Sequence, residues 1–104
     1  MSVINKHYPE IRKMLSVSTI HITKADSELL SKWSGGEATP ILVAKFIYGF
    51  FLYVWDEDED ACPIEEQLSG SFRKVLSFAR RSECSYIQLD CDGAVYEDLD
   101  NHDW

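Results

Sequence analysis

The chain has 104 residues and carries 18 acidic side chains against 10 basic ones, a net charge of −8. Its length fits one small domain, which we expect over residues 14–104, preceded by an N-terminal arm over residues 1–13. The acidic excess excludes a general binder of the nucleic-acid backbone and argues against adhesion to an anionic membrane.

The acidic side chains gather in the second half of the chain. Residues 56–104 hold fourteen Asp and Glu but four Lys and Arg. This asymmetry predicts either a solvated acidic face or a surface for a basic partner protein. The candidate interaction residues are Asp56, Glu57, Asp58, Glu59, Asp60, Asp90, Asp92, Glu97, Asp98, Asp100 and Asp103.

The chain shows no sign of export or of membrane insertion. No apolar core of a secretory signal follows the start, and the longest apolar stretch, residues 41–55, contains Lys45 and is too short for a membrane helix. The three cysteines form no CxxC pair, which favours reduced thiols. We therefore expect a cytoplasmic protein.

The first half of the chain predicts a strand, a helix and a hairpin. Residues 14–22 are rich in β-branched side chains and predict a strand. Thr23 is expected to cap a helix to Trp33, with Asp26 completing the cap and Ala25, Leu29 and Leu30 on its buried stripe. Residues 41–55 predict two aromatic-rich strands that meet at Tyr48-Gly49 and form the core of the sheet.

The second half predicts one amphipathic helix and a further strand. Apolar residues at helical spacing over residues 64–83 indicate the helix, and residues 85–90 the strand, with a short additional strand at 94–96. The order β-α-β-β-α-β predicts an α+β two-layer sandwich. We expect a mostly antiparallel sheet of four or five strands with two helices on one face.

The string Asp90-Cys91-Asp92-Gly93 follows an apolar strand and resembles the nucleophile motif of haloacid-dehalogenase-like phosphatases. In that motif one aspartate attacks phosphorus, the next is the general acid, and magnesium lies between them. Here Ala94 replaces the usual threonine, and only eleven residues follow Gly93. The favoured interpretation is a turn in which the two aspartates accept backbone N–H bonds. Asp90 and Asp92 remain weak candidates for a metal site.

Other metal signatures are incomplete. Asp56, Asp58 and Asp60 match three ligand positions of an EF-hand loop, but Ala61 and Gln67 replace its glycine and its final glutamate. The histidines and cysteines lack the spacing of a zinc site, and His21 is expected to be a packed or edge histidine rather than a ligand. We therefore predict no cofactor and no metal.

Three strings together resemble a family of small uncharacterised bacterial proteins encoded on plasmids, phages and integrated elements. They are LSxxTxHIT at residues 15–23, YGFFLYV at 48–54 and FARxxxCSYIxLDxDG at 78–93, and the terminal Asp103-Trp104 also fits. The resemblance covers residues 14–104. It implies no activity. It implies a mobile-element context, in which small acidic proteins often block host or competitor machinery.

The main hypothesis is an interaction module that binds a basic protein surface or imitates nucleic acid. Two other functions are alternatives to it. A self-associating domain, in the form of a homodimer, would expose Tyr48, Phe50, Tyr53 or Trp55 on one sheet face. A metal-dependent enzyme would use the Asp90/Asp92 pair.

Overall fold

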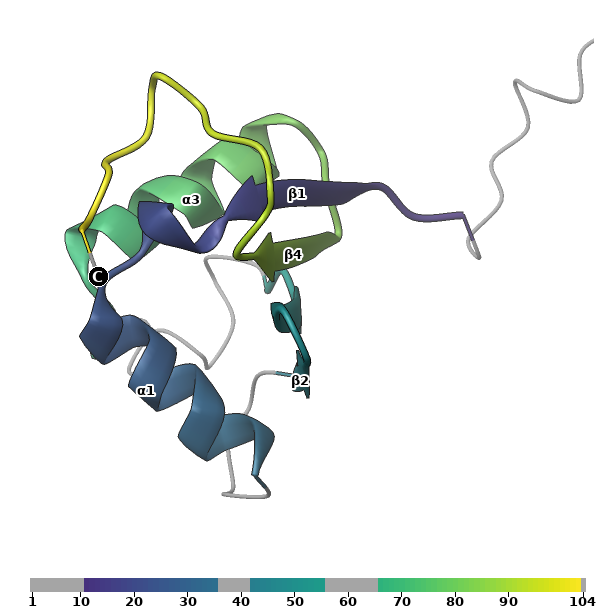
Figure 1. Ribbon diagram of the computed structural model, residues 1–104. Helices are drawn as coiled ribbons and strands as arrows, with labels where there is room; N and C mark the ends of the chain where they lie inside the picture. Colours follow the sequence, from purple (N-terminus) through teal and green to yellow (C-terminus); the bar gives the residue numbers. More distant parts are fainter. Residues whose placement is uncertain (1–10, 36–41, 56–65, 104) are drawn as a thin grey trace, which may run out of the picture.

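The computed structural model describes residues 11–35, 42–55 and 66–103 of the chain (Figure 1). Its elements are β1 (Met14–Ser18), the 3-10 helix η2 (Thr19–His21), α1 (Lys24–Ser34), β2 (Val43–Phe46), β3 (Gly49–Tyr53), α3 (Gly70–Arg81) and β4 (Tyr86–Asp90). This order of strands and helices confirms the predicted α+β class. In the described ranges, residues 94–96 form no strand, so the sheet there has four strands.

The sheet has the order β1-β4-β3-β2. β4 pairs with β1 in parallel and with β3 in antiparallel orientation, and β2 pairs with β3 as a hairpin. The sheet is therefore mixed and mostly antiparallel. The last strand of the chain lies beside the first, inside the sheet.

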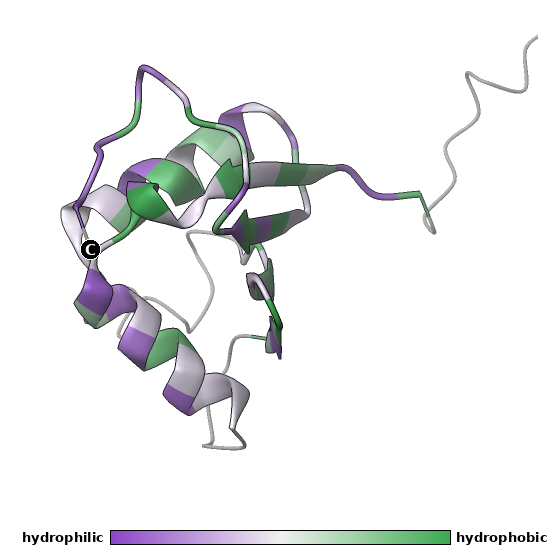
Figure 2. Cartoon of the chain, viewed as in Figure 1, coloured by the Kyte–Doolittle hydropathy of each residue, from purple (hydrophilic) through white to green (hydrophobic). Residues whose placement is uncertain are grey.

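One face of the sheet is buried and the other is open. Along β4, apolar and polar bands alternate (Figure 2), because successive side chains of a strand point to opposite faces. The inner face packs with both helices into one core. Its buried side chains are Leu15, Val17, Phe50, Leu52, Ile87 and Leu89.

The hairpin is less buried than its composition suggested. β2 is an edge strand, and Tyr48, Phe51 and Tyr53 are 52%, 36% and 38% exposed. The prediction that this hairpin is the core of the sheet is therefore wrong for these rings, because they stand on the turn or on the open face. Phe50 and Trp55 are buried, which also overturns their expected exposure in a self-associating face.

Strand β1 and helix α1 depart from the prediction at single turns. The strand ends at Ser18, whose hydroxyl accepts a hydrogen bond from the N–H of Ile20 and starts η2 instead of a longer strand. The predicted capping box of α1 is present. Ala25 is exposed and Asp26 is buried in its place, because Asp26 faces the start of α3.

Helix α3 begins at Gly70, since residues 66–69 form a turn rather than the predicted helix. Ser69 is its N-cap and accepts a hydrogen bond from the N–H of Phe72 at 3.1 Å. The helix buries one stripe against the sheet, Phe72, Val75, Leu76 and Ala79. In the described part of the chain, no helix is long and apolar enough to cross a membrane.

Candidate functional site

The turn after β4 is built by Asp90. Its Oδ1 accepts the backbone N–H of Asp92 at 2.8 Å, and its carbonyl accepts the N–H of Gly93 at 2.8 Å. Its Oδ2 accepts a hydrogen bond from the side-chain amide of Gln88 at 3.1 Å. The N–H of Cys91 donates to the carbonyl of Tyr48, which holds the turn against the hairpin. The motif therefore has a structural use, in which Asp90 accepts the bonds that close the turn.

The glycine of the same motif lies against β1. A Cβ atom on Gly93 would lie 2.6 Å from the carbonyl carbon and oxygen of Val17 and 2.9 Å from the nitrogen of Ser18. These are backbone atoms in a paired strand, so they have little freedom to move. A glycine at this position lets the chain turn back along β1, where the N–H of Ser18 donates to the carbonyl of Ala94 at 2.8 Å.

The turn also brings three ligand-type atoms together. One atom each from Asp90, Cys91 and Asp92 lies within 4.8 Å of the others. Both carboxylate oxygens of Asp90 already accept hydrogen bonds from the protein. This arrangement supplies negative charge at the end of β4, and Asp90 and Asp92 remain the candidates for a cation.

Residues 91–103, the C-terminal strap, run along β1 and over α3 (Figure 1). The hydroxyl of Tyr96 donates to the carbonyl of Ser16, and its ring stacks edge-on against Phe78 of α3 with centroids 5.1 Å apart. Leu99 is buried in the core, and the N–H of His102 donates to the carbonyl of Ile20 at 2.7 Å. The strap is thus fixed along its length, and it covers the free edge of β1. Trp104 lies outside the described residues.

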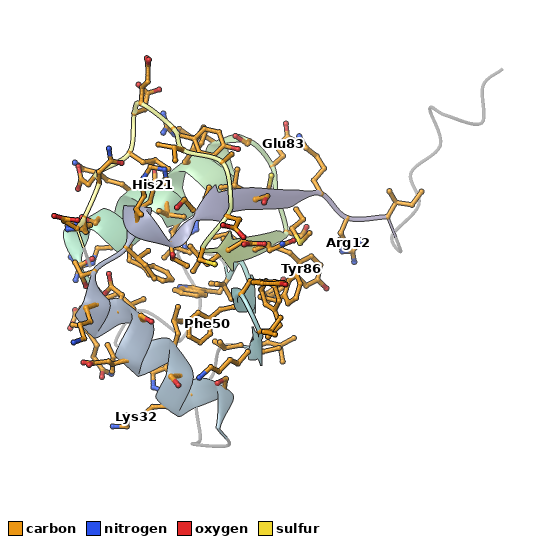
Figure 3. The ribbon with its side chains drawn as sticks, in the orientation of Figure 1. Arg12, His21, Lys32, Phe50, Glu83 and Tyr86 are labelled. Carbon is orange, nitrogen blue, oxygen red and sulfur yellow. The ribbon has the colours of Figure 1, made fainter. Side chains whose placement is uncertain are left out.

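His21 anchors the middle of the strap (Figure 3). Its imidazole is completely buried. Nε2 lies 2.9 Å from the N–H of Tyr96, which can only donate, and Nδ1 lies 2.7 Å from the carbonyl of Asp100, which can only accept. The ring is therefore neutral with its proton on Nδ1. Both ring nitrogens are used, which confirms the predicted packed histidine and leaves none for a metal.

A Ser-His-Asp cluster lies at the end of the strap. The hydroxyl of Ser71 is 2.8 Å from Oδ2 of Asp100 and 2.7 Å from Nε2 of His102. Lys74 donates to Oδ1 of Asp100 at 2.9 Å, and this bond, followed by the one from Ser71, lowers the pKa of Asp100.

The proton arrangement in this cluster rules out an activated serine. An ionised Asp100 can only accept, so the single hydroxyl proton of Ser71 goes to it. His102 must then donate from Nε2 to the Ser71 oxygen. A general base would need an unprotonated nitrogen facing that hydroxyl. The cluster is therefore a tether between the strap and α3.

The acidic candidates divide by their environment. Asp56, Glu57, Asp58, Glu59 and Asp60 lie outside the described residues. Asp100 is paired with Lys74, the one ion pair found between described residues. Four carboxylates on the strap are exposed with no described cation in ion-pairing range, namely Asp92, Glu97, Asp98 and Asp103.

A cleft of about 360 Å³ opens between α1 and the hairpin. Glu28 and Ser31 line it from the helix, Lys45 and Phe46 from β2, and Cys91 from the turn. The Nζ of Lys45 reaches across to the hydroxyl of Ser31 at 3.4 Å. No sequence pattern predicts this cleft, because it depends on how α1 packs against an edge strand.

Comparison with known proteins places the chain in a family without assigning an activity. No curated protein and no solved structure matches it. Residues 14–104 match the C-terminal domain of a family of unknown function, DUF5983. These are the residues that form the sheet, both helices and the strap. The chain therefore belongs to the DUF5983 family.

Proposed function

We propose that this chain is a non-enzymatic protein-interaction module or inhibitor. Its exposed strap carboxylates bind a basic surface on a protein partner, a host or defence protein encountered in the cytoplasm by the product of a bacterial mobile element. A partner that handles nucleic acid suits this chemistry, because spaced carboxylates can imitate phosphates. The run at residues 56–60 adds to the same negative charge.

The observation that carries the proposal is an array of charges on an immobilised segment. Asp92, Glu97, Asp98 and Asp103 are exposed on a strap tied down at His21, Ser16 and Ile20. A preorganised array of charges loses little conformational entropy when a partner binds, so more of its electrostatic attraction contributes to affinity. Complementary charge also speeds encounter and makes binding sensitive to salt.

The test uses two triple variants that change the net charge equally. The first neutralises the strap with Asp92→Asn, Glu97→Gln and Asp98→Asn. The matched control neutralises Glu28→Gln, Glu66→Gln and Glu83→Gln, three exposed acids elsewhere on the fold. Proteins captured from bacterial lysate at low salt are identified, purified and titrated against the wild type and both variants.

We expect a captured basic protein whose affinity falls at least tenfold with the strap variant and little with the control. This corresponds to a loss of about 1.4 kcal/mol in binding free energy. Equal losses of affinity in both variants would show that the net charge of the chain, and not the strap, determines binding, and would contradict the proposal. The proposal would also be wrong if no captured protein binds the strap variant more weakly than the wild type.

A further inference from the structure

The open face of the sheet, here called the outer face, carries a negative charge at one end and a positive charge at the other. Its middle is formed by Ser16, Gln88, Phe51 and Ala44, which lie side by side in the strand register. Asp90 stands at the end where β4 finishes. Arg12 lies two residues before β1, and continuing the alternation of that strand places it in the row of Met14 and Ser16, at the opposite end.

The side chains agree with this placement. In Figure 3, Phe50 points toward α1, whereas Tyr86 points away from both helices, and Arg12 lies at the Tyr86 end of the sheet. Arg12 is exposed, and no acid among the described residues pairs with it. Ser18, the partner of Asp90 in the sheet, follows Arg12 by six residues, so at about 3.3 Å per extended residue the levels of Arg12 and Asp90 lie roughly 20 Å apart.

Aromatic and apolar side chains fill the space between the two charges. Phe46 and Phe51 stack with centroids 4.5 Å apart, and Tyr53 and Tyr86 meet edge-on at 5.8 Å. A hollow of about 70 Å³ lies beside them, lined by Leu42, Ala44, Phe51, Leu52, Tyr53 and Tyr86. A face rich in Phe, Tyr and Met and poor in charge has the composition of an interface centre.

We propose that the outer face is a homodimer interface and that its occupant is a second copy of this chain. Two sheets pack face to face about 10 Å apart, related by a two-fold axis that lies between them and runs perpendicular to the strands. The axis passes at the level of the Leu15–Ile87 pair, midway between the levels of Arg12 and Asp90. That rotation brings Arg12 of each copy beside Asp90 of the other. The pairing of opposite charges at both ends is self-complementary.

The charge pattern favours a second copy over the basic partner of the strap. A basic surface would meet Asp90 at one end of the outer face but would be repelled by Arg12 at the other. Two copies each carry −8, yet their long-range repulsion is screened beyond about 8 Å at physiological ionic strength. The outer face and the strap are therefore separate surfaces with separate partners.

Sedimentation equilibrium of the purified chain at physiological ionic strength, from micromolar to millimolar concentration, tests the inference. We expect a concentration-dependent dimer. Phe51→Thr should raise its dissociation constant at least tenfold, as removal of a central aromatic does. Ile47→Thr is the matched control, because Ile47 is 85% exposed at the hairpin turn and lies off the outer face.

The charge arrangement has its own variants. Arg12→Glu should raise the dissociation constant severalfold, and Asp90→Asn should do the same while keeping a side-chain oxygen for the turn. Lys24→Glu on the exposed side of α1 should have little effect. A monomer at every concentration, a dimer indifferent to Phe51→Thr, or one weakened equally by Ile47→Thr would overturn the interface. A dimer indifferent to Arg12→Glu would overturn the two-fold arrangement. None of these results bears on the strap.

Discussion

The carboxylate of Asp26, in the first turn of α1, accepts hydrogen bonds from both the backbone N–H and the hydroxyl of Ser69, the N-cap of α3. It also accepts the N–H of Thr23, its own N-cap, at 2.9 Å. One buried side chain therefore joins the amino ends of two helices that lie 43 residues apart in the sequence. Its negative charge faces the positive ends of both helix dipoles.

Replacing this carboxylate should be costly for the fold. Asp26→Ala would leave the Thr23 and Ser69 donors without their acceptor in a site that is 1% exposed. Bonds to a charged acceptor each contribute roughly 1.5–3 kcal/mol, so we expect the free energy of unfolding to fall by about 3 kcal/mol. Urea denaturation measures it. Glu28→Ala, on the exposed side of the same helix, should change the free energy by less than about 0.5 kcal/mol.

The tether at Asp100 predicts a dependence of stability on pH. Its pKa is lowered in the folded state by the hydrogen bond from Lys74, and then by that from Ser71. A group with a lowered folded pKa stabilises the fold above its unfolded pKa, about 3.9, and loses that contribution as the pH falls through the folded value. Carboxyl NMR titration should therefore show the Asp100 pKa rise in Lys74→Met. Lys24→Met should leave it where it is.

Glu83 provides a site for stabilisation. Glu83 follows α3 with φ of 59°, in the left-handed region. The N–H of Glu83 donates to the carbonyl of Arg80, and the N–H of Cys84 donates to the carbonyl of Ala79. This is a Schellman motif with glutamate where glycine is usual. Glu83→Gly should raise the free energy of unfolding by about 1 kcal/mol by removing the Cβ conflict. Glu83→Ala retains a Cβ, and an equal gain from alanine would contradict this explanation.

Gly93 and Gly70 form a contrasting pair. Gly93→Ala places a methyl group against the backbone of Val17, so we expect a loss of about 1–3 kcal/mol and faster hydrogen exchange at the Ser18 amide. Gly70→Ala, at the first residue of α3, meets nothing within 4 Å and should be neutral or slightly stabilising. A Gly93→Ala protein as stable as the wild type would mean that the strap is free to move away from β1.

The sequence predicted features that local chemistry decides. The cap at Thr23 and Asp26, the hairpin turn before Gly49 and the turn at Asp90 each depend on residues within a few positions of one another.

Features that depend on distant residues could not be predicted in this way. The position of β4 between β1 and β3 leaves no periodic signal, and neither does the contact of Asp26 with Ser69. The aromatic content of residues 41–55 predicts a hairpin in the core of the sheet, whereas the turn and the open face leave Tyr48, Phe51 and Tyr53 in contact with water. The division of the strap acids into paired Asp100 and unpaired neighbours likewise required the fold.

The pairing of β1 with β4 also sets the order in which the chain can fold during synthesis. Leu15 lies beside Ile87 in the sheet, and His21 meets Tyr96 across 75 residues. While the ribosome is still making α3, β1 has no neighbouring strand and its apolar side chains have no completed core to enter. Contacts of such long range slow folding. The nascent chain must therefore keep β1 soluble until almost all of the domain has emerged.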